Sequence, residues 1–130
     1  MAFSFSPVAV TAASGSHVQG IAIDAKREHL YFSFTTCLVK TDLHGNVIGS
    51  VTGLAGHLGC IACNYDDGRV YGSLEFKQDS IGRGILASLG SDIKLSDGFY
   101  MAIFDAEKID EQIFSNTAEV AGYYQIIVFR

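Results

Sequence analysis

Two histidines recur at the same place in a repeated segment of the chain. His17 opens the segment HVQGIAIDAKREHLYFSF, and His57 opens the altered copy HLGCIACNYDDGRVYGSL forty positions later. A neutral imidazole offers a lone pair to a metal, and a protonated ring donates two hydrogen bonds to an anion. The repeated histidines are therefore candidate ligands for a metal or an anionic molecule. The alternative is structural, because polar residues also recur in repeats to bond with backbone.

Glu75 follows the second strand-like segment of the second copy and precedes a long polar stretch. A carboxylate at a strand end beside a loop can bind a cation or transfer a proton. Its alternative role is an ion pair with Lys77 or Arg83. The candidate ligand-binding residues are therefore His17, His57, Glu75, Lys77 and Arg83. No catalytic group is identified and no metal site is predicted, although His17, His57 and Glu75 are the residues that would serve a metal.

The spacing H-x2-C-x2-C, formed by His57, Cys60 and Cys63, superficially suggests zinc, with Cys37 as the one cysteine left to complete the site. On an extended strand, residues three apart point to opposite faces. Cys60 and Cys63 would then not converge on one ion. We expect these cysteines to fill apolar positions instead.

Each copy of the repeat contains strand-like segments and no apolar stripe of helical period. A repeat of about 40 residues with this content is typical of a β-propeller blade. The run from Asp42 to Asn46 predicts the turn between the third and fourth strands, because Gly45 and Asn46 tolerate a positive φ. We expect an all-β fold of antiparallel β-propeller blades, about two in number, that form an incomplete propeller. The residues expected to pack between blades are Ile21, Ile23, Leu30, Tyr31, Ile61, Val70 and Tyr71.

All 130 residues are assigned to a single partial propeller domain. Residues 1–16 are expected to form a flanking strand, 17–54 the first blade, 55–115 the second blade, and 116–130 the start of a further strand. The second blade carries one long insertion between strands, residues 77–98, and repeat insertions usually lie on a binding face. Because closed propellers use four to eight blades, further copies or missing blades are expected to cover the open edges.

The paired H-x3-I-A and L/V-Y-x-S segments, with V-K-T-D-L-H-G-N-V-I-G between them, resemble the NHL/TolB-like superfamily of bacterial six- or seven-bladed β-propellers. The resemblance covers residues 17 to about 105 and suggests a fragment of about two blades. Such propellers serve as interaction platforms, sugar-acid lactonases, lyases and sensor domains. Related gluconolactonase-like enzymes hold a metal with Glu and Asn/Asp ligands in the central channel, and that ligand set is not matched here.

The predicted function is a ligand-binding or protein-interaction module that contacts a small molecule or a protein through the insertion and the His17/His57 face. The alternative is part of a metal-dependent gluconolactonase-like hydrolase or lyase with its active site on the channel face. No cofactor is expected except a divalent metal under this alternative.

The charge of the chain indicates which partners it binds, and its cysteine content indicates the compartment in which it is found. The formal charge of −5 comes from 14 acidic and 9 basic residues with no basic block, so nucleic acid is not an expected partner. No apolar stretch is long enough to span a membrane. Three cysteines at irregular spacing do not form a disulfide framework, which favours a reducing compartment, and we predict the cytoplasm.

Overall fold

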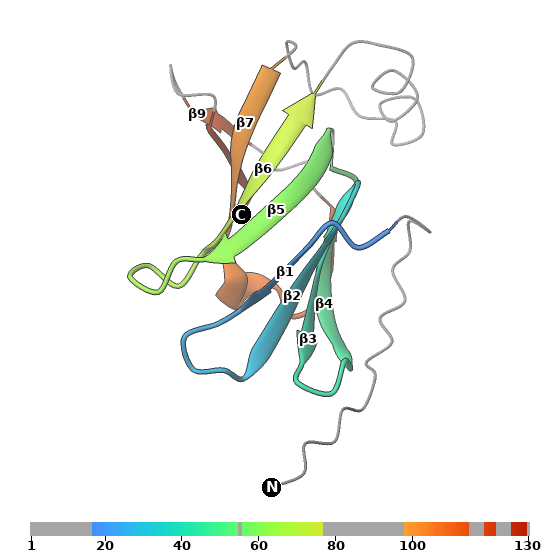
Figure 1. The fold of residues 1–130 in the computed structure, drawn as a ribbon, viewed down its shortest axis with the longest axis vertical. Helices are drawn as coiled ribbons and strands as arrows, with labels where there is room; N and C mark the ends of the chain where they lie inside the picture. The colour runs from blue at the N-terminus through green and yellow to red at the C-terminus, as the bar shows by residue number, and fades with distance from the viewer. Residues whose placement is uncertain (1–16, 55, 77–97, 115–118, 122–125, 130) are drawn as a thin grey trace, which may run out of the picture.

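The computed structural model describes residues 17–54, 56–76, 98–114, 119–121 and 126–129, and most of them lie in strands (Figure 1). The one helical element of these residues is a short 3-10 helix, η1 (Ala106–Lys108). The predicted all-β class is confirmed. The strands are β1 (Gly20–Ile23), β2 (His29–Phe34), β3 (Cys37–Asp42), β4 (Val47–Thr52), β5 (His57–Cys63), β6 (Val70–Phe76), β7 (Gly98–Phe104), β8 (Gln112–Phe114), β9 (Glu119–Ala121) and β10 (Ile126–Phe129).

The strands form two sheets. Sheet one has the order β1-β2-β3-β4-β8, and sheet two has the order β5-β6-β7-β10-β9. Strands β1 to β4 are antiparallel neighbours in chain order, as are β5 to β7, whereas β8 joins β4 and β10 joins β7 in parallel. The antiparallel pairing of β1 to β4 and of β5 to β7 agrees with the prediction. The described parts of the chain do not form a closed propeller, so the propeller stays a prediction.

The strand pairing follows the forty-residue repeat. Ala22 lies opposite Tyr31 across β1 and β2, and Ala62 lies opposite Tyr71 across β5 and β6. The two copies of the repeat therefore have the same register over Ile21–Ile23 and Ile61–Cys63, whereas the pairing of β5 with β6 shifts between Leu58 and Ile61. The predicted insertion falls between β6 and β7, and its residues 77–97 lie outside the described residues.

Residues 112–114 depart from the assignment made from the repeat. They belong to the span predicted as the second blade, yet as β8 they pair in parallel with β4 of sheet one. The backbone N–H of Ser50 donates to the carbonyl of Glu111 at 3.0 Å. Gly49 allows this close contact, because a Cβ there would lie 2.7 Å from the backbone nitrogen of Glu111. The second unit of the repeat is thus tied to the first by a strand.

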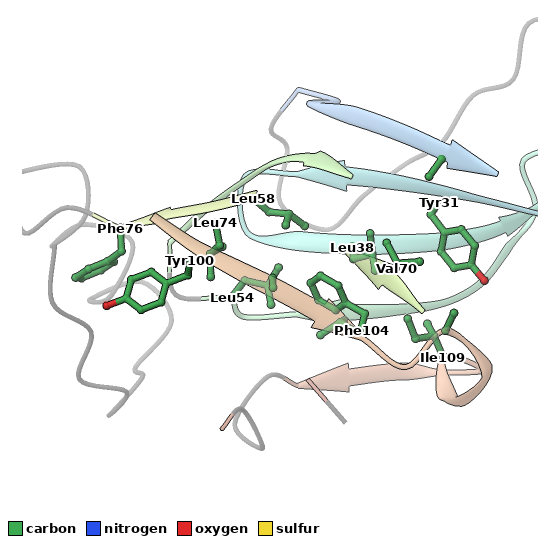
Figure 2. Packing of buried hydrophobic residues seen from close by; sticks show 14 residues of the cluster. Tyr31, Leu38, Leu54, Leu58, Val70, Leu74, Phe76, Tyr100, Phe104 and Ile109 are labelled. Carbon is green, nitrogen blue, oxygen red and sulfur yellow. The ribbon is translucent and has the colours of Figure 1, made fainter. Parts of the chain in front are cut away.

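A hydrophobic core fills the space between the two sheets (Figure 2). Strands β1 to β7 contribute residues to it, and within β6 and β7 these are alternate residues, as the two-residue period of a strand requires. A smaller cluster, built on Phe32, Phe34, Cys37 and Val39, is buried separately. The main core contains Ala22, Tyr31, Leu38, Val51, Leu54, Leu58, Val70, Leu74, Phe76, Tyr100, Ala102, Phe104, Ala106 and Ile109.

Ile21 corrects the predicted core. Its neighbour Ala22 is buried between the sheets, and adjacent residues of a strand point to opposite faces, so Ile21 points away and is 60% exposed. Among the other predicted packing residues, Tyr31 and Val70 are buried in the main core, Ile61 packs against it, Leu30 packs against the smaller cluster, and Ile23 and Tyr71 are half-buried.

The predicted turn from Asp42 to Asn46 joins β3 to β4. The Asp42 carboxylate accepts the backbone N–H groups of His44 at 2.8 Å and Asn46 at 3.0 Å, and the Asn46 side-chain amide at 2.8 Å. Gly45 has a φ of 84°, which glycine adopts without strain. The hydrogen bond from the Asn46 side chain, followed by those from the backbone, lowers the pKa of Asp42.

We expect the Asp42 turn to lose its stabilising effect in acid. Because the pKa is lower in the folded state, the contribution is fully present above the unfolded pKa near 3.8 and is lost as the pH falls through the folded pKa. The melting temperature of Asp42→Asn should therefore fall less steeply than that of the wild type between about pH 5 and about pH 2. Circular dichroism melts measure this, with Asp66→Asn, an exposed aspartate of another turn, as the control. Equal slopes for Asp42→Asn and the wild type would contradict the prediction.

Candidate functional site

The structure brings two of the predicted ligand residues together. His57 is exposed at the start of β5 and lies opposite Glu75, which is half-buried in β6. His17 is exposed three residues before β1, and no hydrogen bond or ion pair of the described residues joins it to His57. Lys77 and Arg83 lie outside the described residues. Within the described part of the chain, no three His, Cys, Asp or Glu side chains are grouped to hold a metal.

The three cysteines lie in different environments. Cys37 is buried in the smaller cluster, Cys63 is half-buried against the main core, and Cys60 is exposed. Burial, with a contribution from the charge of Asp24, raises the pKa of Cys63 to about 11. The expectation that the cysteines fill apolar positions is confirmed for Cys37 and wrong for Cys60. Cys60 lies where the pairing of β5 with β6 shifts register, which removes the regular alternation there.

The sheets meet closely along β1, β2 and β5. The Ser33 hydroxyl donates to the Gly59 carbonyl at 2.6 Å, and the backbone N–H of Leu58 donates to the Thr35 carbonyl at 2.9 Å. Gly20 permits this approach, because a Cβ there would lie 3.1 Å from the Gly59 oxygen. The contact therefore combines apolar side chains with hydrogen bonds to the main chain.

The side of sheet two that faces away from sheet one carries residues whose equivalents in sheet one are buried. Ser33 lies opposite Leu38 and Ser73 lies opposite Met101, so Leu38 and Met101 are equivalent. Leu38 is fully buried between the sheets, whereas Met101 is 43% exposed. Ser33 is likewise buried and Ser73 exposed. We call this surface the rear face, and its residues are Ala62, Tyr71, Ser73, Phe99 and Met101.

A complementary surface lies at β1. Val18 and Ile21 are 47% and 60% exposed. Their equivalents forty positions later are Leu58, which is fully buried in the main core, and Ile61, which packs against that core. We call Val18 and Ile21 the front edge. Val18 and Ile21 are thus exposed where their equivalents in the second copy contact the core. The equivalents of Leu74, Tyr100 and Ala102, which are Phe34, Cys37 and Val39, are buried in the smaller cluster.

The β1–β2 turn, the β5–β6 turn and η1 lie on the same side of the molecule (Figure 1). Residues of all three line a pocket of about 300 Å³. Inside the β1–β2 turn, Oδ2 of Asp24 lies 2.8 Å from Nδ1 of His29, and Oδ1 accepts the backbone N–H of Glu28 at 2.8 Å. Partial burial acts to raise the pKa of Asp24, but the hydrogen bonds from His29 and Glu28 outweigh it and the pKa is lowered. The pocket is lined by Asp24, Ala25, Lys26, Glu28, His29, Tyr31, Lys40, Tyr65, Gly68, Ala106 and Glu107.

Two polar residues that are almost completely buried line this pocket. Lys40 is 7% exposed, and its ammonium donates to the Ala106 carbonyl at 2.9 Å. Tyr31, its neighbour across the strands, is 2% exposed, and its hydroxyl makes no hydrogen bond with the described residues. Figure 2 shows the Tyr31 ring at one end of the core with its hydroxyl directed outward. Burial, with smaller effects of nearby acidic groups, raises the pKa of Tyr31, so the hydroxyl stays a donor.

Lys40 and the Tyr31 hydroxyl are not among the site residues predicted from the sequence. A signal existed, because Lys40 stands within the otherwise apolar start of β3 and the equivalent residue of β7 is Ile103. A lysine at a position that the repeat fills with an aliphatic residue indicates a local role for the charge.

No family model matches the chain, and no curated protein or solved structure is significantly similar to it. In the described residues there is no helix with the length and apolar character needed to cross a membrane.

Proposed function

We propose that this chain is a β-sheet interaction module whose rear face binds the front edge of a second copy, so that copies associate head to tail. The supporting observation is the difference in burial between equivalent positions of the repeat. Leu38 and Leu58 are fully buried in the contact between the two sheets, whereas their equivalents Met101 and Val18 are exposed. Large exposed apolar side chains in a contiguous group mark interaction surfaces.

The contact inside the chain supplies a template for the contact between copies. In the chain, Ser33 donates to the carbonyl of Gly59. The equivalents of these residues are Ser73, on the rear face, and Gln19, beside the front edge. We therefore expect the Ser73 hydroxyl to donate to the Gln19 carbonyl of the second copy. Met101 would pack there as Leu38 packs between the two sheets.

Such a contact joins unlike surfaces, so it continues from copy to copy until a ring closes or a filament grows. A ring of sheets packed face to face is the architecture of a β-propeller, with four to eight blades. The propeller expected from the NHL/TolB-like resemblance is thus part of this proposal. Two repeat units in each copy favour a small ring.

The solution mass of the purified chain, measured by light scattering at several concentrations, tests the proposal. We expect a defined oligomer. Met101→Lys should weaken self-association by about tenfold or more, since it buries an unpaired charge. Leu43→Lys is the matched control, because Leu43 is 46% exposed in the β3–β4 turn, away from both surfaces.

A mixing experiment distinguishes head-to-tail association from a symmetric dimer. Ile21→Lys damages the front edge and Met101→Lys damages the rear face, so each variant keeps one intact surface. Each should be monomeric alone, and a mixture should form a dimer with one copy of each. A wild-type chain that stays monomeric at all concentrations, or variants that do not combine, would contradict the proposal.

A further inference from the structure

We propose that the pocket beside η1 binds a small zwitterion of the amino-acid class, with its carboxylate on Lys40 and Tyr31. Lys40 carries a buried positive charge whose partner among the described residues is a neutral carbonyl, that of Ala106. A buried ammonium is costly unless a negative charge lies beside it. A ligand carboxylate would provide this charge. It would also accept hydrogen bonds from the N–H groups of Lys40 that do not bond to the Ala106 carbonyl.

Tyr31 supplies a second hydrogen-bond donor to the ligand carboxylate. Tyr31 and Lys40 lie directly opposite each other on β2 and β3, so their side chains share one face of sheet one. The Tyr31 hydroxyl is the polar end of a side chain that is otherwise enclosed in the core, and Tyr31 is one of the residues that line the pocket. Two donors from adjacent strands suit the two oxygens of a carboxylate.

The surrounding acidic residues favour a zwitterion over a simple anion. Asp24, Glu28 and Glu107 line the pocket, and Glu28 and Glu107 are exposed. The negative charges of Asp24 and Glu107 act on Tyr31, and they would repel a multiply charged anion such as phosphate. An ammonium group on the ligand would instead be attracted to these carboxylates. The volume of about 300 Å³ is at the lower end of small-molecule sites and fits one amino acid.

Nuclear magnetic resonance titration of the full chain with each of the twenty standard amino acids tests the proposal. We expect at least one of them to shift the backbone signals of Tyr31, Lys40 and Ala106. Sodium acetate and inorganic phosphate serve as probes with an anionic group alone. Both should bind about tenfold more weakly than the amino acid, because they lack the ammonium group.

Variants of Tyr31 and Lys40 test whether these two donors bind the amino acid. Tyr31→Phe keeps the ring and removes the hydroxyl, and it should weaken binding about tenfold. Lys40→Met keeps the length of the side chain and removes its charge, and it should weaken binding by more than tenfold. Lys108→Met is the matched control, because Lys108 is exposed, lies outside the pocket and should not affect binding. If Lys40→Met does not fold, Tyr31→Phe carries the test alone.

The result that would overturn the proposal is the absence of any shift at Tyr31, Lys40 and Ala106 with all twenty amino acids. Unchanged binding in Tyr31→Phe would overturn it too, as would acetate or phosphate that binds as tightly as the amino acid. The pocket lies within a single chain, so these outcomes do not depend on head-to-tail association.

Discussion

Leu38→Ala is expected to lower the free energy of unfolding by about 2–5 kcal/mol. Leu38 is fully buried, lies opposite Val51 in sheet one and faces sheet two across the main core. Removing its branched side chain loses the transfer free energy of three carbon atoms and leaves a cavity between two sheets. Neither sheet can move freely to fill that cavity, because hydrogen bonds such as that of Ser33 with Gly59 hold them together. Urea denaturation followed by circular dichroism measures the loss.

Leu43→Ala is the control for this measurement. It makes the same chemical change at an exposed position of the β3–β4 turn, and it should alter the free energy of unfolding by less than about 0.5 kcal/mol. Similar losses for the two variants would show that the space between the sheets does not form the core described here.

Gly49→Ala is expected to cost about 1–3 kcal/mol, although alanine usually suits a strand better than glycine does. A Cβ at this position would lie 2.7 Å from the nitrogen and 2.8 Å from the oxygen of Glu111, both of which are backbone atoms. A side chain could rotate away, but here the segment from Ile109 to Glu111 would have to move. That movement would break the hydrogen bond from Ser50 to the Glu111 carbonyl and separate β8 from β4.

Val47→Ile is the matched control for Gly49→Ala. It also adds one carbon atom to β4, but at a position that is 55% exposed, and it should change stability by less than about 0.5 kcal/mol. Hydrogen exchange at the backbone amide of Ser50 gives a second readout. We expect faster exchange there in Gly49→Ala and no change in Val47→Ile.

The parts of the fold that depend on local sequence were predictable. The register of Ala22 with Tyr31 and of Ala62 with Tyr71 follows from a repeat that can be read by eye. The turn at Asp42 follows from side chains that bond to their own backbone. In each case the residues that determine the structure are close in the chain.

The parts that depend on distant contacts were not predictable. A repeat assigns equal environments to equivalent residues, but burial depends on whether another sheet lies against them. Leu58 packs against sheet one and is fully buried, whereas its equivalent Val18 is exposed. Equivalent positions of the repeat therefore differ in burial. The pairing of β8 with β4 is also set by tertiary contact, because no local pattern specifies a parallel partner sixty residues away.

The candidate site was predicted only in part. The histidines were predicted as ligand residues because they recur in the repeat, and His57 lies opposite Glu75. The pocket beside η1 could not be predicted, because its lining comes from four segments that are far apart in the sequence. The lysine at a position that the repeat fills with Ile103 was its one sequence signal. The role of a single lysine in a strand can be inferred only when its burial and its neighbours are known.

The link between β8 and β4 also has a consequence for biosynthesis. β4 ends at Thr52 and β8 begins at Gln112, so about sixty residues are added before the partner strand exists. At a translation rate of about 5–20 residues per second, the outer edge of β4 stays unpaired for roughly 3–12 seconds during synthesis. An unpaired edge is the surface to which other nascent strands attach. Slow translation between these two strands should therefore increase misassembly, and a chaperone that covers the β4 edge should decrease it.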